Sequence, residues 1–303
     1  MIVVVNPTAG RGKARRKCQA VVECLRRQNV CVEVITTDGK GHAAEIGEAR
    51  TAEGIKLPDT IVACGGDGLV QEIAHTLAAR KAVLGERCPA LGIIPGGRCN
   101  DFARALRIPS DLKSLAVLLT RGRSQPIDLG SVNGRSFCTV ATIGVDAAIS
   151  DFVNTMRIGL KGKPAYLYGI LCVLPRYRPP VVKVTGLPES LHGPLLVSSF
   201  ANTRFYGGGI PIAPQADSTD GLLDLCMIKP VSIIRLLRLV PRVIRGRHEN
   251  DNDVRFARAK RISVETDEAV TIWADGEPMG KTPALVEIMP KAIRIITPAA
   301  DTP

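Results

Sequence analysis

The sequence Thr60-Ile61-Val62-Ala63-Cys64-Gly65-Gly66-Asp67-Gly68 decides the fold, because an apolar run typical of a buried strand leads directly into three glycines. A helix-like segment over residues 70–77 follows them. Glycines between a strand and a helix expose backbone N–H groups that an anion can approach closely. Asp67 is unusual there, since a carboxylate repels phosphate unless a cation lies between them, so one interpretation is a site for a nucleotide with Mg²⁺. The other is a tight turn in which Asp67 caps the helix.

The same arrangement occurs three times before residue 110. The first copy joins Ile2–Val5 through Asn6-Pro7-Thr8-Ala9-Gly10 to a helix-like segment over residues 13–28. The third joins residues 91–94 through Pro95-Gly96-Gly97-Arg98-Cys99-Asn100-Asp101 to a helix-like segment over residues 102–106. Strands that alternate with helices predict right-handed crossovers and a parallel sheet. All strand-to-helix loops of such a sheet emerge at one edge, where doubly wound folds bind ligands, so we expect the three loops to converge.

Two common nucleotide-binding fingerprints are missing from these loops. None of the three ends in Gly-Lys-Ser/Thr, which argues against a P-loop nucleoside triphosphatase of the usual kind. The pattern Gly-x-Gly-x-x-Gly is absent after the first strand, which argues against a Rossmann dehydrogenase.

The character of the sequence changes after Gln125-Pro126. Residues 127–132 and 136–140 are typical strands, and Asn133-Gly134 between them is a hairpin signal. Further strands are expected over Pro180–Val184, Leu195–Ala201, Leu222–Ile228, Arg261–Val264, Val270–Ala274 and Ala292–Ile296, and helices over Ala147–Met156 and Pro164–Leu174. We therefore predict an α/β nucleotide-binding domain with a parallel sheet over residues 1–126, a mostly antiparallel β-sandwich domain over residues 127–298 and a tail over residues 299–303.

Composition limits the class of protein. The chain has 303 residues, 45% of them hydrophobic, which is enough for the cores of two domains. The N-terminus leads straight into a strand, so no signal peptide is expected, and the longest apolar run, Ala165–Leu174, is too short to span a bilayer. Nine cysteines without a Cys-x-x-Cys pair favour reduced thiols in a cytosolic protein. The four histidines, at 42, 75, 192 and 248, lack the spacing of a metal site.

The formal net charge of +11 is compatible with nucleic acid, an anionic membrane or solubility alone. Aromatic residues make up only 4% of the chain, which disfavours nucleic acid. One basic cluster, Arg11–Lys17, adjoins the first glycine loop. A second, Ser232–Arg247, alternates arginines with apolar residues and could rest on an anionic leaflet. The commoner alternative is a surface helix with an apolar inner face.

Two acidic motifs lie in the second half. Asp275-Gly276-Glu277 follows the strand-like Thr271–Ala274, and on an extended chain its carboxylates would point to one side, where one could accept a proton while the other steers Mg²⁺ or a hydroxyl. The alternative is an exposed hairpin turn, for which Asp-Gly is a strong signal. The sequence Asp217-Ser218-Thr219-Asp220-Gly221-Leu222 offers oxygen ligands that suit Mg²⁺ or Ca²⁺, or else forms a solvated acidic turn.

Together these blocks resemble the diacylglycerol kinase catalytic-domain family, which includes bacterial diacylglycerol and other lipid kinases, sphingosine kinases and ceramide kinases. After the three glycine loops, the resemblance continues in family order through Ile127-Asp128-Leu129-Gly130, Ile143-Gly144-Val145-Asp146, Tyr206-Gly207-Gly208-Gly209, Asp217 to Asp224 and Asp275-Gly276-Glu277, so it covers nearly the whole chain. Two positions depart from the family pattern. Leu69 stands where a hydroxyl residue is usual, although sphingosine kinase-like members also carry Leu, and Arg98 replaces the usual Thr and can grip a phosphate from further out.

The resemblance implies two domains with the active site between them, and an ATP- and Mg²⁺-dependent lipid kinase that phosphorylates a hydroxyl of diacylglycerol or a similar lipid. It implies Glu277 as the general base, with Asp275 beside it, and a structural Mg²⁺ held by Asp217, Asp220 and the carbonyl of Leu222. The implied ATP contacts are Asn6, Pro7, Thr8, Ala9, Gly10, Thr37, Gly66, Asp67, Gly68, Leu69, Val70, Gln71, Glu72 and Arg98. The expected partner is a lipid at the inner membrane face, reached by a cytoplasmic protein through peripheral contact; a homodimer is compatible with the resemblance.

Two other functions remain open at this point. An NAD kinase also uses a Gly-Gly-Asp-Gly loop, although the block from Asn100 to Arg104 and the Asp275-Gly276-Glu277 turn favour the lipid kinase. A nucleotide-binding regulatory protein without turnover would explain Leu69 and Arg98, but it leaves the retained acidic residues without a purpose.

Overall fold

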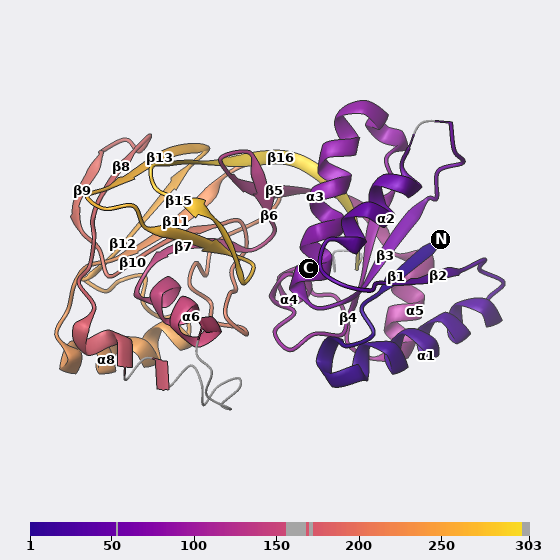
Figure 1. Cartoon of the computed structure of the whole chain (residues 1–303), viewed down its shortest axis with the longest axis horizontal. Coiled ribbons are helices and arrows are strands. Elements are labelled where there is room, and N and C mark those ends of the chain that lie inside the picture. Colours follow the sequence, from indigo (N-terminus) through magenta and orange to yellow (C-terminus); the bar gives the residue numbers. More distant parts are fainter. Residues whose placement is uncertain (53, 156–167, 170–171, 299–303) are drawn as a thin grey trace.

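The computed structural model describes residues 1–52, 54–155, 168–169 and 172–298. Figure 1 shows two parts side by side, one with strands covered by helices and one built mostly of strands. The first part contains β1 (Ile2–Val5), η1 (Ala9–Gly12), α1 (Lys13–Arg27), β2 (Glu33–Thr36), α2 (His42–Arg50), β3 (Thr60–Gly65), α3 (Asp67–Leu84), η2 (Gly85–Arg87), β4 (Ala90–Pro95), α4 (Asp101–Ala105) and α5 (Leu112–Arg121). Its strands lie in the order β2-β1-β3-β4 and all pair in parallel, so the predicted parallel sheet is confirmed.

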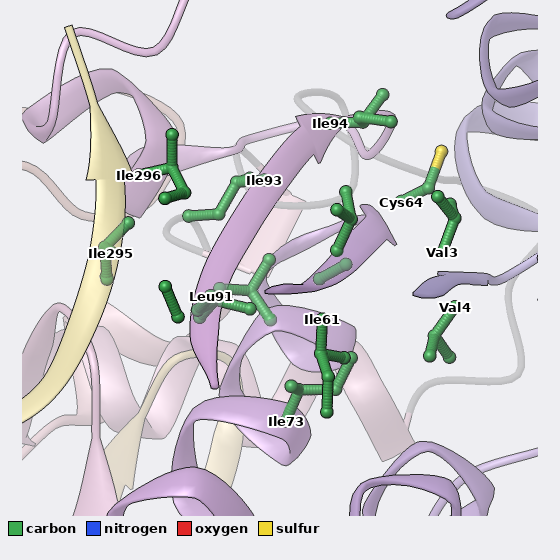
Figure 2. Close-up of a cluster of buried hydrophobic side chains, with 14 of the residues drawn as sticks. Val3, Val4, Ile61, Cys64, Ile73, Leu91, Ile93, Ile94, Ile295 and Ile296 are labelled. Atoms are coloured by element: carbon green, nitrogen blue, oxygen red, sulfur yellow. The ribbon is translucent and has the colours of Figure 1, made fainter. Parts of the chain in front are cut away.

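The core of the first part lies on both faces of this sheet. Every residue of β1 and β3 is buried, as expected for strands that have helices on both sides. Figure 2 shows Ile61 of β3 beside Ile73 of α3, whereas Val3 of β1 lies beside Cys64 on the other face of the sheet.

The second part contains two sheets that face each other. Its elements are β5 (Arg123–Val132), β6 (Arg135–Phe137), β7 (Val140–Gly144), α6 (Val145–Thr155), η3 (Leu174–Arg176), β8 (Val181–Thr185), β9 (Leu191–Pro194), β10 (Val197–Ala201), β11 (Leu223–Ile228), α8 (Ile233–Ile244), β12 (Val254–Ala259), β13 (Arg261–Thr266), β14 (Thr271–Ala274), β15 (Glu277–Lys281) and β16 (Ala284–Thr297). One sheet has the order β12-β11-β10-β7-β14-β15 and is antiparallel. Phe200 and Leu225 from this sheet and Ile262 and Val286 from the other share one buried core, so the predicted sandwich is confirmed.

The two long strands β5 and β16 join the parts. They pair with each other antiparallel from Arg123–Thr297 to Val132–Val286, and Ile295 of β16 also pairs in parallel with Leu91 of β4. The end of the last strand therefore lies in the core of the first part (Figure 2). The boundary predicted at residue 126 falls inside β5. Side chains of β5 and β16 belong to the hydrophobic cores of both parts.

Some elements differ from the expected ones. The strands β9, β12 and β15 were not predicted: β9 is a short strand with Gly and Pro, and pairing with β8 stabilises it. The helix predicted over Pro164–Leu174 falls largely on residues 164–167 and 170–171, which lie outside the described residues. Within the described ranges, no helix has the length and apolar character that crossing a bilayer requires.

Candidate active site

The three glycine loops pack against each other backbone to backbone. Gly96 N and Gly97 N donate to Gly65 O at 2.7 and 3.0 Å. A Cβ at Gly97 would lie 2.4 Å from Gly66 Cα, and a Cβ at Gly10 would lie 2.4 Å from Gly96 O. The loops after β1, β3 and β4 therefore converge at one sheet edge, as the sequence predicted, and two of these contacts leave room only for glycine.

This packing predicts that Gly97→Ala disrupts the site. The new methyl group would meet the Gly66 backbone, which cannot move aside without separating the two loops, so we expect a loss of about 2 kcal/mol or more of unfolding free energy and at least tenfold weaker nucleotide binding. Thermal unfolding and nucleotide titration measure the two effects.

Gly68→Ala is the matched control for Gly97→Ala. A Cβ at Gly68 meets nothing within 4 Å, and Gly68 lies in the first turn of α3, where alanine is the better helix former. Unfolding at the wild-type temperature or above is expected. Equal destabilisation by both substitutions would contradict the close contact of the loops.

The first loop is held in shape by its own side chains. Asn6 Oδ1 accepts from Thr8 N at 3.0 Å and from Thr8 Oγ1 at 2.8 Å, and Asn6 N donates to Cys64 O. Pro7 and Ala9 complete the turn, in which Ala9 N donates to Asn6 O. Thr37, by contrast, is buried, and both its N–H and its hydroxyl donate to Val5 O, so its side chain ties β2 to β1.

Asp67 does not cap its helix. Gly66 is the N-cap of α3, and no side chain in the described part of the chain bonds the first-turn amides, so the interpretation of Asp67 as a cap is wrong. Instead Asp67 Oδ1 accepts from Phe102 N of α4 at 3.4 Å. The N-terminal amides of α3 thus remain available for an anion at the positive end of the helix dipole.

The rest of the run predicted to contact ATP enters the core. Leu69, Val70 and Gln71 are buried, and Leu69 Cδ2 would lie 2.8 Å from a Cβ at Gly65. The departure at Leu69 is therefore a change in packing beneath the loop. Glu72 Oε1 accepts from Gly41 N at 3.1 Å and so fixes the loop before α2. Arg98 is exposed on the third loop, and no acidic side chain among the described residues pairs with it.

Three carboxylates from distant parts of the chain lie near one another. Asp101, at the start of α4, accepts from Arg104 Nη1 at 2.9 Å and from Gly208 N at 2.7 Å. Asp275 accepts from Cys138 N at 2.6 Å, from Thr139 N at 2.9 Å and from the Thr139 hydroxyl. Burial, followed by the charges of Asp275 and Asp101, raises the pKa of Asp67 to about 6, and burial also raises the pKa of Asp275. Negative charge concentrated in a partly dry site favours a cation.

The Asp275-Gly276-Glu277 segment is a hairpin turn between β14 and β15. Asp275 and Gly276 have φ values of +51° and +85°, so the expectation of an extended chain here is wrong, since this turn type requires positive φ at both central residues. The alternative expectation of an exposed hairpin turn is correct for the turn but not for the exposure of Asp275, because three donors hold the Asp275 carboxylate. Glu277 begins β15 with a side chain 29% exposed.

Glu277 forms an ion pair across the two parts. Its Oε2 contacts Lys40 Nζ, which lies in the loop that Glu72 fixes. Sequence reasoning missed Lys40, because a lysine between glycines carries no signal of a partner 237 residues away. It also assigned no role to Asp101, although Asp101 is the first residue of α4 as Asp67 is the first residue of α3.

The residues present fit a divalent cation that the nucleotide helps to hold. Within the described ranges no group of three or more His, Cys, Asp or Glu side chains forms a closed metal site. Mg²⁺ bound with a nucleotide uses one or two carboxylates and completes its shell with phosphate oxygens and water. Among the described residues, Asp67 accepts hydrogen bonds only from backbone N–H groups, so it suits that role.

The acidic loop between β10 and β11 uses one carboxylate oxygen of Asp217 and one of Asp220 in local hydrogen bonds. Asp217 Oδ1 accepts from Thr219 N and Oγ1, and Asp220 Oδ1 accepts from Leu222 N. Arg258 approaches Asp220 Oδ2 to 3.9 Å. The buried Asp128 ties this loop to β16, since it accepts from Gly221 N at 2.7 Å and from Lys291 N at 2.6 Å. Metal binding by Asp217, Asp220 and Leu222 stays a prediction.

The raised pKa of Asp67 predicts how pH affects stability when nucleotide and divalent cation are absent. The carboxyl ionises near pH 4 in the unfolded chain and near pH 6 in the folded one, so the cost of its charge is absent below about pH 4 and complete above about pH 6. Asp67→Asn removes this cost, and the variant is expected to exceed the wild type by about 2 to 3 kcal/mol in unfolding free energy at pH 7 and to equal it at pH 4. Denaturant titrations with a chelator test this, and a gain independent of pH would contradict it.

Comparison with known proteins agrees with this fold. Residues 1–132 match the family model of the diacylglycerol kinase catalytic domain, and residues 139–297 match the YegS C-terminal NAD kinase beta sandwich-like domain. A diacylglycerol kinase of Mycobacterium tuberculosis is 34% identical over 302 residues, covering 97% of this chain and 94% of that protein. One of Bacillus subtilis is 29% identical over 297 residues, covering 98% and 95%. The crystal structure of a diacylglycerol kinase from Bacillus anthracis superposes with a TM-score of 0.74 at 26% identity, covering 99% of this chain and 97% of that one.

Proposed function

The chain belongs to the diacylglycerol kinase catalytic-domain family and is a lipid kinase, and on this premise we propose that it transfers the γ-phosphoryl group of ATP to a hydroxyl of diacylglycerol or a similar lipid. In the transfer, the bond between the γ-phosphorus and the oxygen that bridges it to the β-phosphorus breaks. A bond from the γ-phosphorus to the lipid oxygen forms, and the hydroxyl proton leaves to a base.

One observation carries this proposal. The Asp275-Gly276-Glu277 turn of the second part adjoins the glycine loops of the first, as the charge effect of Asp275 on Asp67 and the ion pair of Glu277 with Lys40 both indicate. Phosphoryl transfer depends on positioning and on charge stabilisation, and this junction offers backbone amides, carboxylates and a candidate base in one place.

Each residue then has a defined task. Glu277 accepts the proton of the lipid hydroxyl, and Lys40 orients its carboxylate. The N-terminal N–H groups of α3 bind the phosphates together with the N–H groups of the glycine loops that are not bonded within or between the loops, and Arg98 reaches the phosphates from the surface. Asp275 fixes the turn that carries Glu277. Asp67 would hold Mg²⁺, which supplies positive charge to the phosphate oxygens when bound.

The remaining assignments follow from the acceptor. A lipid with two acyl chains resides in a membrane, so we place the reaction at the inner membrane face through peripheral contact. By the family pattern, a second Mg²⁺ at Asp217, Asp220 and the Leu222 carbonyl would stiffen the loop that Asp128 anchors.

The test is product identification. The purified protein is incubated with labelled ATP, MgCl₂ and a panel that includes diacylglycerol, sphingosine, ceramide, monoacylglycerol and NAD. Label in diacylglycerol or a related lipid is the expected result. Labelled NAD without any labelled lipid would overturn the proposal in favour of an NAD kinase, which the name of the second family model keeps as the competing activity.

A further inference from the structure

The helix α8 carries an apolar face that the rest of the described protein does not cover. Ile233, Ile234, Leu237, Val240 and Ile244 are exposed, with exposed fractions from 42% to 69%. At 100° per residue these positions fall on one side of the helix. A surface helix ordinarily presents polar residues on its outer side.

The opposite side of α8 holds the helix firmly in place. Leu239 is fully buried, and Leu236 and Val243 pack against the same core. Arg235 Nε donates to Asp253 at 2.7 Å, and Arg242 Nη1 donates to the buried Asp251 at 2.9 Å. The expected inner apolar face is therefore present, and the outer apolar face is a second one that is fixed toward solvent.

A basic strip lies between these two faces. Arg238 and Arg245 project from the sector beside the exposed apolar stripe, and residues 230–248 contain no Asp or Glu. Among the described residues, no acidic side chain pairs with Arg238, Arg245 or Arg247. Arg245 and Arg247 also line a hollow of about 510 Å³ at the C-terminal end of α8.

We propose that α8 docks the protein onto a bilayer containing anionic lipids, with the stripe of Ile233, Ile234, Leu237, Val240 and Ile244 among the acyl chains and Arg238, Arg245 and Arg247 at the headgroup phosphates. An interfacial helix needs such a combination of apolar stripe and flanking cations. A second copy of the chain would bring the same cations face to face, so the charge distribution disfavours a symmetric dimer here. Figure 1 shows α8 at the outer end of the second part, away from α1 and α5. The docking rests on the proposed function only in that the acceptor lipid is in the same membrane.

Vesicle co-sedimentation of the full chain tests this proposal without any turnover. Neutral vesicles of phosphatidylcholine are compared with vesicles of phosphatidylcholine and phosphatidylglycerol at roughly 3:1, which carry a negative surface potential. The wild type is expected to bind the anionic vesicles at least tenfold more tightly. The double variant Arg238→Gln/Arg245→Gln is expected to weaken this binding about 20-fold at low salt, and Leu237→Ser about tenfold.

Matched controls come from other exposed positions. Val117→Ser on α5, where Val117 is 51% exposed, and Arg15→Gln/Arg16→Gln on α1 are expected to leave vesicle binding within twofold of the wild type. Equal losses in these controls would show that net charge or hydrophobicity alone is responsible and would overturn the assignment to α8.

Two further results would overturn the proposal. The first is absence of wild-type binding to anionic vesicles. The second is a dimer in sedimentation velocity that Leu237→Ser dissociates while vesicle binding stays unchanged, since a second copy would then cover the stripe. Phosphorylation of a short-chain acceptor dispersed in detergent is expected to be equal in wild type and Leu237→Ser. Failure of the proposed function would appear as absence of this phosphorylation in both proteins, so the two failures are distinguishable.

Discussion

Glu277→Gln is expected to lower the turnover of lipid phosphorylation by about 10²- to 10⁴-fold, the usual contribution of a positioned general base. Glutamine keeps the size of the side chain, and its carbonyl oxygen can still accept from Lys40, so the β14–β15 turn should keep its shape. Only the ability to accept a proton is lost. Steady-state kcat with a lipid acceptor measures the effect, and nucleotide affinity, measured by titration, should change less than about threefold because in the proposed site the phosphates contact the glycine loops instead of Glu277.

The matched control for Glu277→Gln is Glu265→Gln. Glu265 lies on β13 and pairs with Lys183 at 3.1 Å, so both substitutions remove one carboxylate from an ion pair with lysine. The turnover of Glu265→Gln should equal that of the wild type, because the Glu265 and Lys183 side chains are exposed and their ion pair contributes little to stability. Wild-type turnover in Glu277→Gln would exclude Glu277 as the base.

Asp67→Asn is expected to lower kcat/KM for the nucleotide–metal complex by about 10³-fold, because several kcal/mol of charge stabilisation depend on the cation that Asp67 would hold. The α3 amides and the packed loops stay intact in this variant, so nucleotide without metal should still bind. Raising the concentration of the divalent cation should recover part of the activity. The same substitution is expected to stabilise the protein at pH 7, so its stability and its activity should change in opposite directions.

Asp59→Asn is the comparison for Asp67→Asn. Asp59 is exposed just before β3, whereas Asp67 follows the other end of that strand, so only the latter substitution should affect metal dependence. A wild-type dependence on divalent cation in Asp67→Asn would remove Asp67 from the site and leave Asp101 and Asp275 as the remaining carboxylates.

The sequence predicts the sheet edge well because its information is local. Each glycine loop adjoins its own strand and helix, and parallel pairing brings the loops together without any further specification. The return of β16 to the first part was not predicted, because the pairing of Ile295 with Leu91 joins residues about two hundred positions apart. The contact of Lys40 with Glu277 escaped for the same reason.

Side-chain direction limits what a motif can say about a site. Leu69 lies within the glycine block, yet the α3 turn directs it beneath Gly65 into the core, where an apolar residue packs well. Arg98, at the other unusual position, points to solvent. The sequence shows that both positions depart from the family pattern. It does not show that Leu69 is buried and that only Arg98 changes the exposed surface of the site.

The helix α8 shows a different limit. Its alternation of arginines with apolar residues fits an inner face and an outer face equally well, and composition gives no rule for choosing between them. The anchoring of Arg235 and Arg242 by Asp251 and Asp253 settles the rotation of the helix, and this contact depends on the chain reversal after residue 244.

The stoichiometry of phosphoryl transfer tests the central claim most directly. Wild-type protein, labelled ATP and MgCl₂ are mixed with diacylglycerol in anionic vesicles, and ADP and lipid phosphate are quantified in the same samples. The account predicts one phosphorylated lipid for each ADP formed, with both products lost together in Glu277→Gln. Formation of ADP without phosphorylated lipid, or recovery of the label in NADP when NAD is supplied, would contradict it.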